Sequence, residues 1–321
     1  MRVIELFAGI GACSSALKRV GFKIDIVDAV EIDKYAIKSF NAIHGTNFEV
    51  QDITKWDKNF ENIDLITHGS PCQDFSLAGK QAGGDIGSGT RSSLMYETIR
   101  IVEKIMPKYV LWENVKNVLS KKHKHNFDNY INIMDKLGYN SYYKVLNAKD
   151  YGIPQNRERV FTISIRKDID KKDFKFPDKE NLKLNLKDIL EDQVEDKYYL
   201  DEIKNNHNIK ENYIHKKYQE FYNKNGYIPE MFNPYNSSEI KNIAPTQSTQ
   251  CGSTTSSSTI LKLEEKYILP KILDDRDKGY GIKISDIYPT QRANRYGIKV
   301  IENNFKIRKL TPKECWRLMR I

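Results

Sequence analysis

The sequence predicts an α/β fold in which a mostly parallel, doubly wound sheet is joined to a smaller, irregular domain. Residues 1–166 alternate apolar, strand-like runs with helical stretches, and a glycine-rich turn follows the first run. Residues 167–305 lose this rhythm and are rich in Lys, Asn, Tyr and Ser. Because ligands of such sheets bind beyond the carboxyl ends of the strands, the functional site is expected in the segments that directly follow them.

The alternation predicts strands and helices in a regular order. The expected strands are Val3–Phe7, Ile24–Val30, Ile63–Thr67, Tyr109–Trp112, Ser141–Leu146 and Val160–Ile165. The expected helices between them include Ser14–Val20, Lys34–Asn41, Ser92–Ile105 and Phe127–Leu137. A last helix is expected to begin after Thr311, since threonine is a good N-cap, Pro312 suits the first helical position and Glu314 suits the first turn.

Composition excludes several classes of protein. The 321 residues are 39% hydrophobic, enough for a sizeable core, but their apolar runs are too short to cross a membrane. Four cysteines (Cys13, Cys72, Cys251, Cys315) form no CxxC pair, which argues against a disulfide framework and a metal site and favours the reducing cytoplasm. The net charge is +9, and the last 16 residues carry six basic side chains and one acidic one. This excess weakly favours an anionic partner.

The turn after the first strand has the character of a nucleoside-binding site. Gly9 and Gly11 allow a sharp bend and a close approach of backbone to ligand, and Glu31 follows Gly9 by 22 residues, at the end of the second strand. There a carboxylate can accept hydrogen bonds from ribose hydroxyls. The third glycine of the dinucleotide pattern is replaced by Ser14, and a purely structural tight turn is the alternative. Asp52 could bind an adenine amino group or cap a helix.

Cys72 follows the third strand, in a loop that the preceding Pro71 makes rigid. A cysteine at this place can act as an exposed nucleophile, and the alternative is a small buried hydrophobic residue. The polar, glycine-rich flank at Gly79–Thr90 favours exposure beneath a mobile lid.

Charged residues accompany two further strands. Glu113 emerges from the fourth strand and could transfer a proton or cap a helix. Arg157 and Arg159 are two positions apart, so both are expected on one face of the last strand. They could face the site or form an ordinary edge paired with Glu158.

Five of these segments together resemble the DNA cytosine-5 methyltransferases. They are Phe7-Ala8-Gly9-Ile10-Gly11, Pro71-Cys72-Gln73, Glu113-Asn114-Val115, Gln155-x-Arg157-x-Arg159 and Arg308-x-Leu310-Thr311-Pro312-x-Glu314. Their order and approximate spacings agree with the family over nearly the whole chain. The resemblance implies a Rossmann-like fold that uses S-adenosylmethionine. It also implies a catalytic and cofactor-binding domain at 1–169, a target-recognition domain at 170–305 and the start of a C-terminal return segment at 306–321.

The resemblance also implies roles for individual residues. Cys72 matches the thiolate that adds to C6 of a flipped-out cytosine, Glu113 the residue that contacts N3 and the exocyclic amine, and Arg159 the residue that contacts O2. Arg157 is similar to the supporting partner of that arginine. The implied cofactor-binding residues are Phe7, Gly9, Gly11, Glu31, Ile32, Asp52, Ile53 and Pro71. The implied DNA-binding residues are Gln73 and Ser76 in the lid Gln73–Thr90, and Arg292 and Arg295 in the recognition domain.

Several alternatives accompany this interpretation. The serine-rich loop Thr246–Ser258 could read base edges or serve as a linker. The family continues for a few dozen residues beyond the last helix, so a truncated chain or a second chain that supplies the missing motif is expected. Double-stranded DNA in a prokaryotic or phage restriction-modification system is the expected substrate. A tRNA-methylating relative, an inactive DNA-binding protein and, more remotely, a nicotinamide oxidoreductase are the alternatives.

Overall fold

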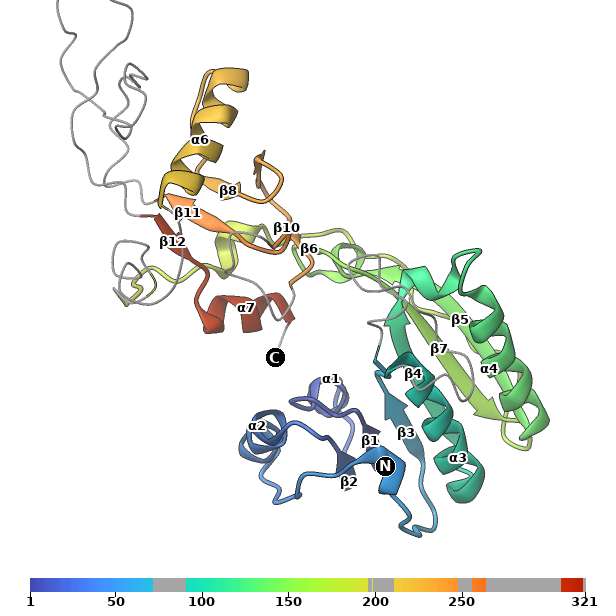
Figure 1. Cartoon of the computed structure of the whole chain (residues 1–321). Helices are drawn as coiled ribbons and strands as arrows, with labels where there is room; N and C mark the ends of the chain where they lie inside the picture. The colour runs from blue at the N-terminus through green and yellow to red at the C-terminus, as the bar shows by residue number, and fades with distance from the viewer. Residues whose placement is uncertain (72–90, 196–197, 199–210, 248–255, 264–306, 320–321) are drawn as a thin grey trace, which may run out of the picture. The chain divides into compact units, whose positions relative to one another are not determined.

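The computed structural model describes residues 1–71, 91–195, 198, 211–247, 256–263 and 307–319. The chain divides into two units (Figure 1). Unit 1 contains Met1–Asn147 and Glu158–Lys179, and unit 2 contains Ala148–Arg157 and Glu180–Arg320.

Unit 1 is built on a six-stranded sheet in the order β2-β1-β3-β4-β7-β5. The strands are β1 (Arg2–Leu6), β2 (Asp25–Val30), β3 (Leu65–His68), β4 (Tyr109–Val115), β5 (Tyr139–Asn147) and β7 (Glu158–Arg166). In this sheet β7 runs antiparallel to both of its neighbours, and the other five strands share one direction. The prediction of a mostly parallel sheet is therefore confirmed.

The helices of unit 1 cover both faces of this sheet. They are α1 (Ala12–Arg19), α2 (Lys34–His44), α3 (Met95–Ile105) and α4 (Lys124–Lys136), with short 3-10 turns η1 (Ile53–Lys55), η2 (Arg91–Leu94) and η3 (Lys116–Leu119). All four lie where helices were predicted. Helix α4 begins three residues before the expected Phe127, because its first turn is polar and is held by an ion pair between Lys124 and Asp128.

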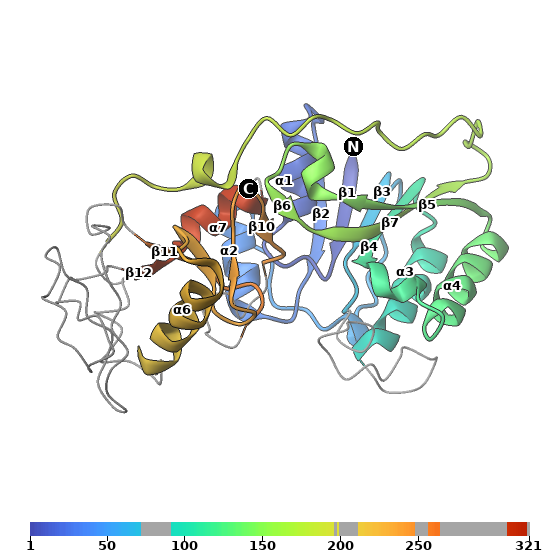
Figure 2. The same cartoon turned by 90° about the horizontal axis from the view of Figure 1, so that it is seen from above.

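The main apolar core lies between the sheet and helices α3 and α4, which Figure 2 shows on one side of the strands. Strand β1 points Ile4 and Leu6 into this core. By the alternation of a strand, Glu5 faces the opposite side, where its carboxylate accepts a hydrogen bond from the Ser14 amide of α1 at 2.7 Å. A smaller cluster packs α2 against β2 through Phe40 and Ala29.

The described residues of unit 2 form a four-stranded antiparallel sheet, a two-stranded parallel pair and two helices. The sheet has the order β12 (Ile307–Lys309), β11 (Leu261–Leu263), β8 (Met231–Asn233), β9 (Ser238–Glu239), and the pair is β10 (Ala244–Pro245) with β6 (Gln155–Asn156). Its 3-10 turns are η4 (Ala148–Tyr151) and η5 (Leu186–Ile189), and its helices are α6 (Glu211–Asn225) and α7 (Pro312–Met319). Helix α6 lies in the stretch that was predicted to be irregular. It packs because Ile214, Tyr218 and Phe221 recur at helical spacing and meet Phe232 of β8.

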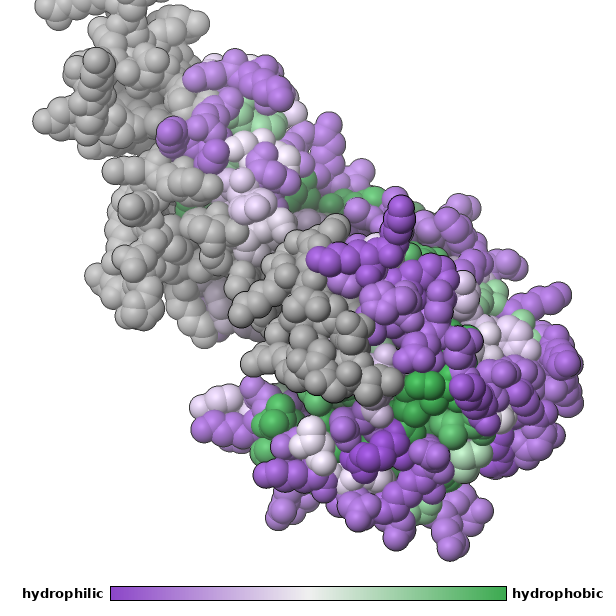
Figure 3. Space-filling view, turned by 45° about the vertical axis from the view of Figure 1, so that its right-hand side comes forward, coloured by the Kyte–Doolittle hydropathy of each residue, from purple (hydrophilic) through white to green (hydrophobic). Residues whose placement is uncertain are grey.

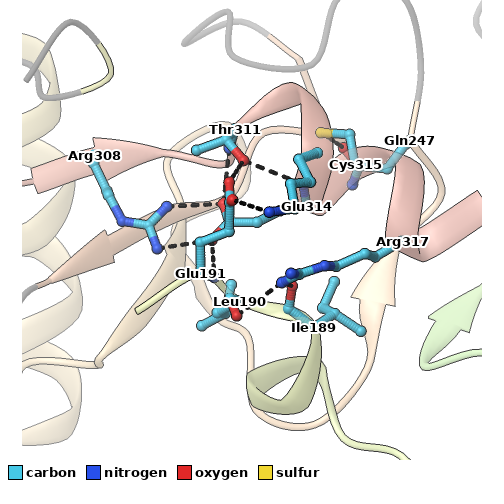
Figure 4. Close-up of polar contacts among 10 residues, drawn as sticks. Ile189, Leu190, Glu191, Gln247, Arg308, Thr311, Glu314, Cys315 and Arg317 are labelled. Atoms are coloured by element: carbon cyan, nitrogen blue, oxygen red, sulfur yellow. Dashed lines mark hydrogen bonds and ion pairs between the residues drawn. The ribbon is translucent and has the colours of Figure 1, made fainter. Parts of the chain in front are cut away.

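The predicted start of the C-terminal helix is confirmed (Figure 4). The Glu314 amide donates to Thr311 Oγ1 at 3.2 Å, and the Thr311 amide donates to Glu314 Oε2 at 2.7 Å, which is a reciprocal capping box. At the other end of the helix, Leu318 enters an apolar cluster with Leu186 and Ile189 of η5.

Across the described ranges, none of the helices combines the length and apolar character that a membrane span requires. In the space-filling view, hydrophilic side chains cover most of the coloured surface, with small apolar patches between them (Figure 3).

Candidate functional site

The strand order reverses at β1, which lies between β2 and β3. In open α/β sheets this switch point opens a crevice beyond the carboxyl ends of the strands. The segments after β1, β2, β3 and β4 are those that carry the predicted site residues, so the topology of unit 1 brings them to one edge of the sheet.

The turn after β1 has an unusual backbone. Phe7, Gly9 and Gly11 all have positive φ, of 54°, 55° and 83°. A Cβ on Gly9 would meet no atom within 4 Å, so this glycine leaves its surroundings open to a ligand. A Cβ on Gly11 would lie 2.1 Å from His44 Nε2, so Gly11 is required for the packing of the turn against α2. The two positions thus favour glycine for different reasons, and the binding of the cofactor by both stays a prediction.

Glu31 follows β2 and is held in place by the backbone. Its Oε2 accepts a hydrogen bond from the Gly9 amide and its Oε1 accepts one from the Asp33 amide, each at 2.8 Å. Because each carboxylate oxygen can accept a second hydrogen bond, the group can still bind two ribose hydroxyls. The adjacent Ile32 is 68% exposed and can cover an adenine ring.

Asp52 lies close to this carboxylate along the chain fold, since the Gln51 amide donates to the Glu31 carbonyl at 2.9 Å. Asp52 caps η1 by accepting hydrogen bonds from the Thr54 hydroxyl and amide, and its side chain is partly exposed, so it could also bind an adenine amino group. The hydrogen bonds from Thr54 lower the pKa of Asp52, which keeps it an acceptor. The Ile53 side chain is buried in the core at 5% exposure, and its contact with the adenine stays a prediction.

These residues fit the adenosine part of S-adenosylmethionine, because an open glycine turn, a preoriented carboxylate and an exposed apolar side chain occur at one edge. We expect Glu31→Ala to weaken cofactor binding by about 1–3 kcal/mol, the range for losing hydrogen bonds to a charged group. Titration calorimetry measures this change. Glu49→Ala, which removes an exposed carboxylate to which no role is assigned, is the matched control and should bind normally. Equal affinity of wild type and Glu31→Ala would remove Glu31 from the cofactor site.

The loop after β3 is fixed to β4 by hydrogen bonds that the sequence analysis missed. Ser70 is 3% exposed, and its hydroxyl accepts from Trp112 Nε1 at 3.1 Å. Asn114 Nδ2 donates to the Ser70 carbonyl at 3.3 Å. The sequence did contain a signal for these hydrogen bonds, because β3 and β4 are parallel neighbours and polar residues stand at the end of each. Pro71 ends this anchored segment, whereas Cys72, Gln73, Ser76 and the rest of the predicted lid lie outside the described residues.

Glu113 and Arg159 form an ion pair beside this loop. Arg159 Nε lies 3.0 Å from Glu113 Oε1, with the side chains 18% and 32% exposed. The antiparallel register of β4 and β7 produces this meeting, because it pairs Val115 with Arg159. A Cβ built on Gly69 would lie 3.8 Å from Glu113 Oε2, which places the carboxylate next to the segment that leads to Cys72.

The other predicted arginines are placed differently. Arg157 lies between β6 and β7, outside both strands, and belongs to unit 2, so the alternation of a strand does not put it on the face of Arg159. The prediction that both arginines belong to one strand is therefore wrong for Arg157, whereas its part in the site stays a prediction. Arg292 and Arg295 lie outside the described residues.

Burial disables two other reactive groups in unit 1. Burial, reinforced by the nearby Glu5 carboxylate, raises the pKa of Cys13 to about 12, so this thiol stays protonated and is a poor nucleophile. Burial also lowers the pKa of His68 to about 3. This imidazole stacks on Trp112 with centroids 5.6 Å apart, and its Nε2 lies 3.1 Å from the Tyr130 hydroxyl, directly before the loop that leads to Cys72.

The pKa of His68 has a consequence for stability. An unfolded histidine binds a proton near pH 6.5, whereas the folded one stays neutral down to about pH 3, so the unfolded state takes up more protons between these values. The free energy of unfolding should therefore fall by up to about 1.4 kcal/mol per pH unit below 6.5 through this group alone. Urea unfolding at pH 7, 6 and 5 should show a shallower decline in His68→Gln. Parallel declines in the two proteins would contradict this.

In the part of the chain that the structure describes, no group of three His, Cys, Asp or Glu residues is arranged to hold a metal ion.

The chain is similar to known methyltransferases. The type II methyltransferase M2.ScrFI of Lactococcus lactis subsp. cremoris is 37% identical over 254 residues, covering 62% of this chain and 70% of that protein. The orphan methyltransferase M.SPRI of Bacillus phage SPR is 37% identical over 246 residues, covering 66% of this chain and 54% of that protein. The structure of the Entamoeba histolytica methyltransferase EhMeth has the same fold, with a TM-score of 0.60 at 16% identity over 99% of this chain and 85% of that one. Residues 1–320 match the family described as C-5 cytosine-specific DNA methylase, and the chain belongs to that family.

Proposed function

We propose that this protein transfers a methyl group from S-adenosylmethionine to C5 of cytosine within a specific sequence of double-stranded DNA. The observation that carries the proposal is the Glu113–Arg159 pair, held 3.0 Å apart beside the loop that leads to Cys72. The family to which the chain belongs, and the names of its relatives, support the same activity. The substrate favours action in the cytoplasm of a bacterium, as part of a restriction-modification system or as an orphan enzyme.

The chemistry requires a nucleophile because C5 of cytosine is unreactive on its own. The Cys72 thiolate adds to C6, and the electron pair of the C5–C6 double bond then becomes available at C5. Glu113 contacts N3 and the exocyclic amine, where charge develops, and Arg159 contacts O2 and orients the ring. Once C5 carries the methyl group, its proton leaves to solvent, the double bond re-forms and the Cys72 thiolate departs.

The cofactor supplies an electrophilic methyl group on a sulfonium. We assign its binding to Phe7, Gly9, Gly11 and Glu31 at the switch point, with Ile32, Asp52 and Ile53 at the adenine. Pro71 completes the proposed set. Gly11 and Ile53 also support this site through packing.

DNA recognition is assigned to the second half of the chain. The target base must leave the helical stack to reach Cys72, which costs about a few kcal/mol. We propose that Gln73 and Ser76 in the segment Gln73–Thr90 contact the opened duplex. Arg292 and Arg295, within the proposed recognition domain at 170–305, would read base edges in the major groove. Arg157 supports Arg159 in this scheme from the segment that precedes β7.

The test is incubation of the full chain with methyl-labelled cofactor and either mixed duplex DNA or mixed tRNA, followed by mapping of modified cytosines. Label at C5 of cytosines within one short duplex sequence is the expected result. Label confined to tRNA would replace the proposal with the tRNA-methylating alternative. Sequence-specific binding of DNA without transfer, unaffected by Cys72→Ala, would replace it with the non-catalytic alternative.

A further inference from the structure

A turn rich in lysine lies immediately after the strand that carries Glu113. Residues 114–127 contain four lysines and two histidines and no aspartate or glutamate. We call residues 120–125 of this stretch the basic turn. We propose that Lys121 and Lys122 in the basic turn bind DNA phosphates that flank the target cytosine. This inference rests on the proposed function, since it concerns the same DNA at the same site.

The position of the basic turn follows from the topology of unit 1. Strand β4 ends at Val115, two residues after Glu113, and η3 leads directly from it into the basic turn. The turn therefore lies at the carboxyl edge of the sheet, where β3 also ends, as the connection from β4 to α4 in Figure 1 shows. A duplex that delivers a flipped base to Glu113 must bring its backbone to this edge.

Hydrogen bonds and buried side chains hold the basic turn in a defined conformation. The Ser120 carbonyl accepts hydrogen bonds from the amides of His123 and Lys124 at 2.9 and 2.8 Å. The side chains of Val118 and His123 are 0% and 1% exposed and anchor the turn to the core. A rigid turn presents its exposed side chains with little loss of backbone entropy on binding.

The four lysines differ in whether their charge is already paired. Lys116 lies 3.0 Å from Glu158, and Lys124 is paired with Asp128 on α4. Lys121 and Lys122 are exposed and make no ion pair with any described residue. Their two positive charges are thus available to a polyanion. Exposed lysines that neutralise phosphates add affinity without reading sequence, and they fix the register of the protein on the duplex.

The experiment measures the affinity of Lys121→Gln/Lys122→Gln for duplex DNA at several salt concentrations. Each phosphate contact contributes about 0.9 to the slope of log K against log salt, so the slope should become shallower by about 2. At 0.1 M salt the same relation predicts about a tenfold loss of affinity per lysine. The dissociation constant for S-adenosylmethionine should not change, which shows that the variant is folded.

The matched control is Lys171→Gln/Lys172→Gln. These adjacent lysines are also exposed, but they follow β7, whose end lies by the start of β4, since the Arg166 amide donates to the Lys108 carbonyl. They are therefore at the opposite edge of the sheet. The inference would be overturned if the slope of log K against log salt in the Lys121/Lys122 variant equalled that of the wild type. Equal losses of DNA affinity in the two double variants would overturn it as well. Methylation by the wild type in the same preparation is scored separately, so that its absence counts against the proposed function and not against the lysines.

Discussion

Cys72→Ser should abolish methyl transfer, with a rate at least about 10³-fold below that of the wild type. A serine hydroxyl is far less nucleophilic than a thiolate at neutral pH, so the adduct at C6 would not form. A 10³-fold loss corresponds to about 4 kcal/mol of transition-state stabilisation. Single-turnover transfer of labelled methyl to duplex DNA measures the rate, and calorimetry should show that S-adenosylmethionine still binds.

Cys315→Ser is the control for this substitution. Cys315 lies on α7 in unit 2, where its sulfur is 4.0 Å from Gln247 Oε1, and the proposed mechanism gives it no part. This variant should keep the wild-type rate. Retained transfer in Cys72→Ser would refute the nucleophilic role of Cys72.

Glu314→Gln should destabilise unit 2 by about 3–5 kcal/mol, because it removes the carboxylate charge that faces the buried Arg308 guanidinium. Arg308 and Glu314 are both 0% exposed and joined by two hydrogen bonds, of 2.8 and 2.9 Å (Figure 4). The same carboxylate accepts from the amides of Thr311 and Glu191, at 2.7 and 2.8 Å. One side chain thus joins β12, the start of α7 and the segment after η5. Urea unfolding of the full chain measures the loss.

Two further variants separate charge burial from local damage. The double variant Arg308→Met/Glu314→Leu removes both charges of the buried pair and should lose less stability than Glu314→Gln. Its remaining loss comes from the Thr311 and Glu191 amides, which no longer have the carboxylate as acceptor. Lys313→Ala breaks a pair with Glu191 whose lysine side chain is 66% exposed, and it should cost less than about 1 kcal/mol. Equal loss of stability in Glu314→Gln and Lys313→Ala would show that the buried pair is not what holds these segments together.

The sheet and the start of α7 could be predicted because local signals determine them. Strands of four to nine residues are marked by short apolar runs, and Thr311-Pro312 followed by Glu314 carries its own capping chemistry. The position of Glu31 was predictable for a similar reason, since it directly follows a strand.

Other features depend on contacts between distant segments. Gly11 is required by His44 of α2, 33 positions away, and Ser70 is held by Asn114, 44 positions away. No local pattern encodes such pairs. For Arg157 a local pattern was misleading. Its spacing from Arg159 suggested one strand, but β6 ends just before Arg157 and β7 begins just after it. Helix α6 escaped prediction because Lys, Asn and Glu surround its apolar positions.

The central claim is a transient bond between the Cys72 sulfur and C6 of the target cytosine. Duplex DNA that carries 5-fluorocytosine at the methylated position tests it most directly, because fluorine at C5 cannot leave as a proton does and the adduct persists. In the presence of S-adenosylmethionine, mass spectrometry should find one oligonucleotide attached to the peptide that contains Cys72. Methylation of the normal duplex with no conjugate on the fluorinated one, or a conjugate on another residue, would contradict the account.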